Sequence, residues 1–348
     1  MKLILSAAVL AVFLISAQPA VAQTGTVEHI KVHGKLLEGN LEGDSPDRDV
    51  SVYLPPGYRK NARQRYPVIY MLHGYTDSDD KWMGPTKHWI NLPSVIDKAL
   101  AAKESREFIV VMPNGFTRYH GSMYSNSVTT GDWEDFVAVE LVAYVDTHYR
   151  TIPSAASRGL AGHSMGGYGA MRIGMKHPEI FLAVYLQSPC CMAVWDPERS
   201  TAFLEKAATV KNFDDIAKVE FLPRVMLASA AAWSPNPKNP PLYLDLPWKD
   251  GKWQPDIAQK WAADAPLVTL DQYITNLKRL NGLAFDAGDK DQPIAANIAI
   301  LDEALNSSNV PHSFEIYDGD HLNHIAERFE TKVLPFFTKN LSFTPEHK

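Results

Sequence analysis

The pentapeptide Gly162-His163-Ser164-Met165-Gly166 constrains this chain more than any other stretch, because it fits the pattern G-x-S-x-G. In this pattern a strand turns sharply into a helix and holds its turn residue in strained backbone geometry, and only glycine fits two positions to either side. The turn exposes the hydroxyl of Ser164 at a helix N-terminus, where the free amide of Met165 faces developing negative charge. The pattern predicts a nucleophilic serine at Ser164, and an ordinary tight turn is the alternative.

A nucleophilic serine needs two partners, because its hydroxyl is too weakly acidic to attack a carbonyl without a base, and the base needs an acid that fixes its tautomer. The order expected along the chain is Ser, then Asp or Glu, then His. His321 follows the last predicted strand by a glycine-containing turn, so it is the predicted base, with His324 as the alternative. Asp291 is the predicted acid, because it lies beyond the turn at Gly288 and faces the last loop; Asp289 is the alternative.

A second candidate feature follows the apolar run at residues 66–72, which is typical of a central strand covered on both faces. His73-Gly74-Tyr75 comes directly after it. Glycine there lets the backbone turn with its amides pointing into the crevice at the strand's carboxyl end. The amide of Tyr75 is therefore the predicted second donor of an oxyanion hole, beside that of Met165. In the alternative interpretation this is an ordinary turn, and His73 makes a structural hydrogen bond.

The remaining pattern predicts an α/β fold with a mostly parallel central sheet flanked by helices. Alternation of polar and apolar residues between Thr26 and Leu54 predicts antiparallel strands ahead of that sheet. Further strands are expected at 108–112, 158–161, 183–187, 282–288 and 313–317, and helices at 92–102, 133–149 and 294–305, with a closing helix ending near 337. Asp132 is expected to cap the second of these helices. The loop at 116–130 should overhang the crevice.

From about residue 192 to 278 the chain changes character. No clear strand is apparent, and this insertion, which precedes the acid-bearing strand, holds five tryptophans and a proline-rich stretch at 234–241. An insertion of this length without sheet predicts a lid of short helices and loops over the crevice. Each single tryptophan is interpreted as part of the insertion's own core.

The N-terminus is typical of a secretory signal peptide over residues 1–22. It has Lys2, an apolar core at 3–15 and the small-residue exit Ala20-Val21-Ala22. An uncleaved anchor is the alternative. We expect residues 23–348 to form one catalytic domain that is secreted or periplasmic, with no other membrane span. The oligomeric state stays open.

Charge and cysteine content exclude some classes of protein. A net charge of −6 without long charged blocks argues against nucleic acid as a partner. The two cysteines, Cys190 and Cys191, are adjacent, so free thiols are expected and a disulfide-built scaffold is excluded. A vicinal disulfide between them, in an oxidising compartment, is the alternative.

A metal site is the rival interpretation of the acidic and histidine residues near the C-terminus. The set comprises Asp289, Asp291, Asp318, Asp320, His321 and His324. There is no H-E-x-x-H motif or tight ligand spacing, and a metal site leaves Ser164 and its glycines unexplained. A phosphate-binding glycine loop with lysine and a dinucleotide fingerprint are also missing from the sequence.

Several motifs together resemble one family. They are VYLPPGY at 52–58, MLHGY at 71–75, WEDF at 133–136, LAGHSMGGYGAM at 160–171, the aspartate after Gly288 and G-x-H ending at His321. The chain resembles the broad esterase family of α/β hydrolases, which includes S-formylglutathione hydrolases, feruloyl esterases, enterochelin esterases and mycolyltransferases of the antigen 85 group. The resemblance covers most of residues 23–348; the long insertion departs from it.

The resemblance implies a triad of Ser164, Asp291 and His321, an oxyanion hole from the amides of Tyr75 and Met165, and no metal or cofactor. We expect an exported serine esterase that acts on carboxylic esters such as feruloyl, acetyl or other carbohydrate-linked esters. Acyl transfer to a sugar or alcohol is the alternative activity. A ligand-binding protein on a disabled hydrolase frame is the alternative outside enzymes.

Overall fold

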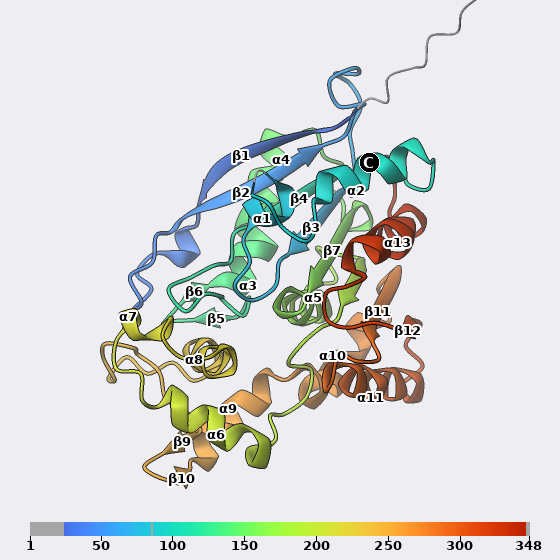
Figure 1. Ribbon diagram of the computed structural model, residues 1–348. Coiled ribbons are helices and arrows are strands. Elements are labelled where there is room, and N and C mark those ends of the chain that lie inside the picture. The colour runs from blue at the N-terminus through green and yellow to red at the C-terminus, as the bar shows by residue number, and fades with distance from the viewer. Residues whose placement is uncertain (1–23, 85, 346–348) are drawn as a thin grey trace, which may run out of the picture.

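The computed structural model describes residues 24–345 except residue 85. The predicted signal peptide lies outside the described residues. The chain builds one eight-stranded sheet in the order β1-β2-β4-β3-β7-β8-β11-β12 (Figure 1). Its strands are β1 (Thr26–His33), β2 (Asp47–Leu54), β3 (Val68–Leu72), β4 (Ile109–Pro113), β7 (Arg158–His163), β8 (Ala183–Gln187), β11 (Gly282–Gly288) and β12 (Ser313–Tyr317).

Strand direction agrees with the expected layout. β2 runs antiparallel to both β1 and β4, and the six strands from β4 to β12 run parallel. Every residue of β3, β4, β7 and β8 is buried, as expected of apolar strands covered on both faces. The predicted α/β fold with a mostly parallel sheet is confirmed.

Side chains of each strand alternate between two cores, one on each face of the sheet. In β3, Val68, Tyr70 and Leu72 pack into one core, and Ile69 and Met71 into the other. The first core includes α5 (Met165–Lys176), α11 (Ile294–Ser307) and the helical stretch from α3 (Trp133–Asp135) through η2 (Phe136–Leu141) to α4 (Val142–His148). The second includes α1 (Asp79–Met83), α2 (Leu92–Ala101), α12 (Ile325–Arg328), η4 (Phe329–Val333) and α13 (Leu334–Asn340).

Two details of the helices differ from expectation. The helical stretch at 133–148 is interrupted by π-helical geometry at η2, and η4 is also π-helical. Asp132 occupies the N-cap position of α3, but its side chain makes no capping hydrogen bond, so the predicted cap is wrong. Its backbone, at φ −86° and ψ 70°, departs from the extended conformation that a capping residue normally has. Short elements elsewhere are η1 (Lys35–Leu37), β5 (Asn126–Ser127), β6 (Gly131–Asp132) and η3 (Ala155–Ser157).

The insertion between β8 and β11 is mainly helical. It holds α6 (Pro197–Ala207), α7 (Phe213–Ile216), α8 (Phe221–Trp233), α9 (Pro255–Asp264), α10 (Pro266–Leu277) and a hairpin of two-residue strands, β9 (Trp248–Lys249) and β10 (Lys252–Trp253). Figure 1 shows α6–α9 together on one side of the molecule, beyond the carboxyl ends of the parallel strands. Trp233 and Trp261 are buried and pack edge to face, 5.5 Å between ring centroids. Trp261 also donates to Ser234 within the insertion, as expected of the insertion's own core. Trp233 differs from that expectation, because its ring also packs on Tyr168 of α5 and donates to Ser125, so it joins the insertion to the rest of the molecule.

Among the described residues, none of the helices combines the length and the apolar character needed to cross a bilayer.

Candidate active site

Ser164 lies at the sharp turn between β7 and α5, with φ 56° and ψ −115°. This backbone conformation is strained for a residue with a side chain. The flanking glycines make the turn feasible: a Cβ on Gly162 would lie 2.1 Å from the carbonyl oxygen of Gly166, and one on Gly166 would lie 1.9 Å from that of Leu72. The Ser164 amide donates to the carbonyl of Gln187 on β8, 3.0 Å away. The close backbone contacts at Gly162 and Gly166 and the hydrogen bond to β8 thus hold the turn in place. Ser164 is half-buried at the tip of this turn.

His321 and Asp291 are paired. His321 Nδ1 lies 2.7 Å from Asp291 Oδ2, and since the carboxylate can only accept, the ring donates from Nδ1 and leaves Nε2 free of that bond. Asp291 is 9 % exposed and follows β11, where its amide donates to the carbonyl of Gly288. His321 follows β12 and is one-third exposed. This is the pairing that a base oriented by an acid requires.

The alternatives weighed from the sequence are engaged elsewhere. Asp289 Oδ1 accepts the amide of Gly319 at 3.0 Å, which makes Asp289 a residue that joins two loops. His324 Nδ1 lies 2.8 Å from Glu327 Oε2 on the exposed surface. Neither is bonded to the His321–Asp291 pair.

His163 connects the His321 loop to the serine turn, a contact that the sequence did not indicate. Its Nε2 donates to the carbonyl oxygen of His321 at 3.0 Å, and the two rings are 4.7 Å apart. Burial, together with the nearby charge of His321, keeps the pKa of His163 well below its usual value, so its ring is neutral. His163 occupies one of the variable positions of G-x-S-x-G, so the pattern carries no signal for this role.

His73 makes the structural hydrogen bonds considered as an alternative for its loop. Its Nδ1 donates to the carbonyl of Gly74 at 2.8 Å, and its Nε2 accepts the amide of Gly115 at 2.8 Å. The ring is fully buried, and burial lowers its pKa, so the neutral form is held with the proton on Nδ1.

The same loop also comes close to the serine. A Cβ on Gly74 would lie 3.5 Å from Ser164 Cβ, so the backbone just before Tyr75 passes beside the nucleophile candidate. The next two amides, of Thr76 and Asp77, donate to the carbonyls of His120 and Gly74. Met165 begins α5, so its amide has no partner within the helix. Both predicted oxyanion donors therefore belong to segments that border Ser164.

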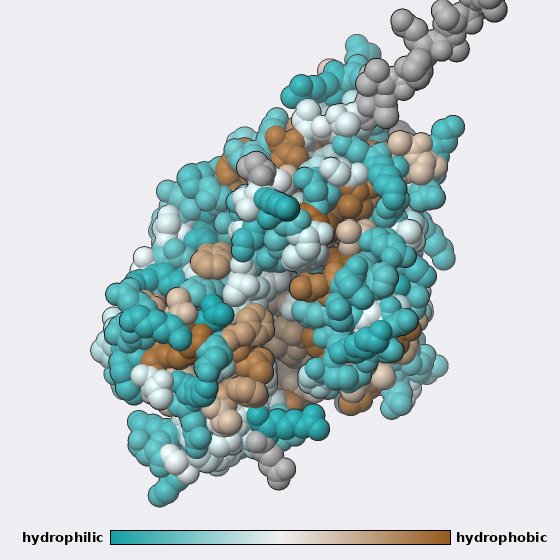
Figure 2. Space-filling view, viewed as in Figure 1, coloured by the Kyte–Doolittle hydropathy of each residue, from teal (hydrophilic) through white to brown (hydrophobic). Residues whose placement is uncertain are grey.

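The walls of this region include exposed apolar side chains from distant parts of the chain. Gly121 of the 116–130 loop lies against the region, since a Cβ there would be 2.6 Å from the ring of Tyr75 and 2.7 Å from Met165 Sδ. Phe221 of α8 packs edge to face on Tyr75, 5.6 Å between centroids. Figure 2 shows a hollow in this face with hydrophobic residues on its walls, between the α8 side and the α10 side. Separate cavities of about 640, 540 and 570 Å³ are lined by none of Ser164, Asp291 and His321.

Comparison with known proteins decides the family. A family model described as "Putative esterase" matches residues 45–330. The chain belongs to this esterase family. Membership confirms the resemblance seen in the sequence and supports carboxylic-ester hydrolysis by a serine hydrolase as the reaction class.

Individual relatives agree with this assignment. The chain is 30 % identical over 154 residues to an endo-1,4-beta-xylanase/feruloyl esterase of Xylanibacter ruminicola, covering 43 % of this chain and 21 % of that protein. It is 34 % identical over 133 residues to an esterase of Mycobacterium tuberculosis, covering 37 % of this chain and 26 % of that protein. The match thus spans about a fifth to a quarter of each relative's length.

Solved structures share the fold. A ferulic acid esterase superposes with a TM-score of 0.64 at 21 % identity, covering 91 % of this chain and 99 % of the other. An S-formylglutathione hydrolase from Agrobacterium tumefaciens gives 0.59 at 17 % identity, covering 94 % and 99 %.

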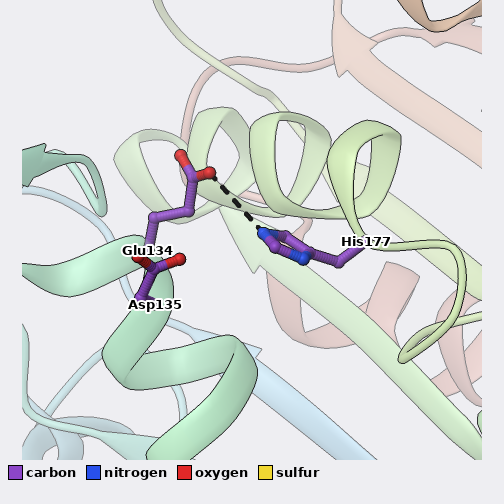
Figure 3. A group of neighbouring side chains, drawn as sticks. All are labelled: Glu134, Asp135 and His177. Atoms are coloured by element: carbon purple, nitrogen blue, oxygen red, sulfur yellow. Dashed lines mark ion pairs between the residues drawn. The ribbon is translucent and has the colours of Figure 1, made fainter.

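The acidic and histidine residues considered as metal ligands do not gather into one cluster among the described residues. The group with ligand-like spacing there is a different one, Glu134, Asp135 and His177 (Figure 3). The carboxylate of Glu134 is already paired with two cations: it lies 2.7 Å from Arg172 Nε and 3.0 Å from Lys176 Nζ. These cations supply the positive charge that a metal ion would bring, so we read the group as an ion-pair network between α3 and α5.

Proposed function

We propose that this chain is an exported serine esterase that cleaves carboxylic esters through a Ser164–His321–Asp291 triad and an acyl-enzyme. The observation that carries the proposal is the combination of a strained serine turn with a His321–Asp291 hydrogen bond of 2.7 Å on neighbouring strand ends. Ser164 follows β7, Asp291 follows β11 and His321 follows β12. These strands run parallel in the order β7-β8-β11-β12, so the three residues follow strand ends at the same end of the sheet.

The proposed reaction has two steps. Ser164 Oγ attacks the ester carbonyl carbon while His321 Nε2 takes the hydroxyl proton, and Asp291 stabilises the resulting imidazolium through Nδ1–H. The amides of Tyr75 and Met165 donate to the oxyanion. The carbon–oxygen bond to the alcohol breaks, and the alkoxide leaves with the proton from His321. Water then attacks the acyl-enzyme with His321 again as base, releasing the acid and restoring Ser164.

Support for the substrate class comes from the relatives and from the N-terminal sequence. One relative is named as a xylanase/feruloyl esterase, and one structural neighbour as a ferulic acid esterase. The first 22 residues are typical of a signal peptide, which supports a secreted or periplasmic location. We therefore propose carbohydrate-linked feruloyl or acetyl esters as substrates. The helical insertion would act as a lid over them.

The test is a kinetic comparison of variants with an activated ester such as 4-nitrophenyl acetate. Ser164→Ala should remove essentially all turnover, and His321→Ala should lower kcat by several orders of magnitude. His324→Ala is the matched control and should change kcat by less than about threefold, since that ring bonds to Glu327 instead. Turnover retained by Ser164→Ala, with its product and rate unchanged, contradicts the proposal.

Product analysis separates hydrolysis from acyl transfer. With a feruloyl or acetyl donor and an added sugar or alcohol, hydrolysis releases the free acid as the main product. Predominant formation of the new ester would replace hydrolysis by transferase activity while keeping the triad.

A further inference from the structure

We propose that Arg224 and His120 form a carboxylate-binding subsite beside Ser164, so that the preferred esters carry a carboxylate in addition to the ester group. The inference rests on the proposed esterase function and names a chemical feature of its substrate.

Arg224 is a partly buried cation without a partner. Among the described residues its guanidinium makes no hydrogen bond or ion pair, and its Nε is buried with no acceptor. The other shielded arginines among the described residues all have partners. Arg48, Arg158, Arg172 and Arg328 each pair with a carboxylate, and Arg150 donates to the carbonyl oxygens of Tyr58 and Gln64. Arg224 departs from the rule that buried charges are paired.

Its position on the helix makes the charge still less favourable. Arg224 lies in the fourth position of α8, near the positive end of the helix dipole, and that first turn holds no acidic residue. Glu220, the residue just before α8, pairs with Lys206 instead. Arg224 therefore makes no contact that would stabilise the fold, and residues that destabilise a fold locally are typical of binding sites.

Arg224 belongs to the turn of α8 that packs against Tyr75. Phe221 lies one turn before Arg224 on the same side of α8, and its ring packs on Tyr75, whose amide is a proposed oxyanion donor. His120 precedes Gly121, where an added Cβ would lie 2.6 Å from the Tyr75 ring, so the His120 loop and the first turn of α8 border the same tyrosine. Burial lowers the pKa of His120, and the charge of Arg224 lowers it further.

His120 is the second member of the subsite. Its ring stacks on Phe116 at 5.2 Å, and its carbonyl accepts the amide of Thr76, next to Tyr75. Among the described residues its ring nitrogens have no hydrogen-bond partner, and the side chain is half-exposed. Backbone φ at His120 is 66°, so the residue is held in an uncommon conformation that presents this side chain.

The chemistry of the pair fits a carboxylate. A guanidinium presents a planar fork of N–H donors that matches two carboxylate oxygens, and a neutral imidazole adds one more donor. The carboxylate would belong to the acyl part or to the alcohol part of the ester. In both cases Arg224 and His120 would bind the carboxylate in the same way. Esters that carry the carboxylate on the acyl part or on the alcohol part distinguish the two cases.

Two matched pairs of esters test the proposal. The acyl pair is 4-nitrophenyl hydrogen glutarate against 4-nitrophenyl pentanoate, and the alcohol pair is 4-acetoxybenzoate against 4-acetoxybenzamide. Wild-type protein should show a higher kcat/KM for the carboxylated member of one pair. Arg224→Gln should lower that ratio by about 10- to 100-fold, the effect expected of a charge-assisted hydrogen bond.

Further variants distinguish the subsite from a general charge effect. Arg224→Lys should lie between wild type and Arg224→Gln, because an ammonium cannot bind in the bidentate fork. His120→Phe keeps the stack on Phe116 and should lower the ratio by about 2- to 10-fold. Arg279→Gln is the control. It removes an equal charge from the loop before β11, at the amino end of that strand and not at the carboxyl end where the proposed site lies, so it should leave the ratio unchanged.

Ratios near one for wild type in both pairs, or an equal ratio in wild type and Arg224→Gln, overturn the subsite while leaving the esterase proposal intact. Calorimetric binding of 4-acetoxybenzoate and of 4-nitrophenyl hydrogen glutarate to Ser164→Ala protein makes the test independent of turnover. The double variant Ser164→Ala/Arg224→Gln should bind one of these compounds about tenfold or more weakly than Ser164→Ala does. If the two proteins bind each compound with the same affinity, the subsite is overturned.

Discussion

Replacing Glu134 by glutamine should weaken the folded state by about 3 kcal/mol at pH 6 and by much less at pH 3. Glu134 on α3 is 4 % exposed and is paired with Arg172 and Lys176 of α5, the helix that follows Ser164. Arg172 Nη1 also lies 2.5 Å from Asp264 Oδ1, at the end of α9. This network therefore ties the serine-bearing helix both to α3 and to the insertion.

The magnitude follows from the carboxyl group's pKa. Burial alone would raise it, but His177, Arg172 and Lys176 outweigh burial and lower the pKa of Glu134 from 4.5 to about 2. A pKa depressed on folding contributes stability that is present above the unfolded value and is lost as pH falls through the folded value. The depression corresponds to about 3 kcal/mol at pH 6, and less than half of it remains at pH 3.

The assay is urea unfolding followed by tryptophan fluorescence, with wild type and Glu134→Gln compared between pH 6 and pH 3. Working at pH 6 and below avoids most of the titration of His177 in the wild type, because its Glu134 contact raises the pKa of that ring. Asp135→Asn is the matched control, because it removes a neighbouring carboxylate that bonds only to Asn126 at the surface, and it should cost less than about 1 kcal/mol. A difference between wild type and Glu134→Gln that is the same at both pH values would refute the reasoning.

Two further predictions concern the site. Asp291→Asn should lower kcat on 4-nitrophenyl acetate by about 10⁴-fold by disturbing the base's tautomer, whereas Asp289→Asn should lower it by less than about tenfold; the reverse order, measured by steady-state kinetics, makes Asp289 the acid. Gly166→Ala should abolish soluble folded protein or most activity, since the new Cβ would lie 1.9 Å from the carbonyl oxygen of Leu72. At Gly57 the three atoms nearest to an added Cβ all belong to the carboxylate of Glu107, the end of a flexible side chain, so Gly57→Ala should be far milder in thermal unfolding. Equal losses in the two variants would contradict the steric argument.

The parallel sheet was predictable because burial on both faces leaves a local signature. Mainly apolar runs bounded by turn residues indicated β8 at 183–187 and β11 at 282–288, and the structure has the same bounds. The last strand, β12 at 313–317, also has the predicted bounds, but it alternates polar and apolar residues and none of its residues is buried. The π-helical geometry at η2 was not predictable, because its residues keep the apolar spacing of an ordinary helix.

The site was predictable to the level of loops. The chain order and the strand ends indicated where Asp291 and His321 would lie, but two aspartates and two histidines fitted that description, and only their partners separate them. His163 reaches the carbonyl of a residue 158 positions away, and no local pattern encodes such a contact. The isolation of Arg224 is of the same kind, since a missing partner is visible only when all the neighbours are in place.

Labelling with a fluorophosphonate, followed by intact-mass measurement and peptide mapping, tests the central claim most directly. An activated serine attacks the phosphorus and keeps the adduct, whereas an ordinary serine hydroxyl does not react at neutral pH. The account predicts one adduct per chain on Ser164, and no adduct in Ser164→Ala or, at the same exposure, in His321→Ala. An unlabelled wild-type protein that is folded, or an adduct mapped to another residue, would contradict it.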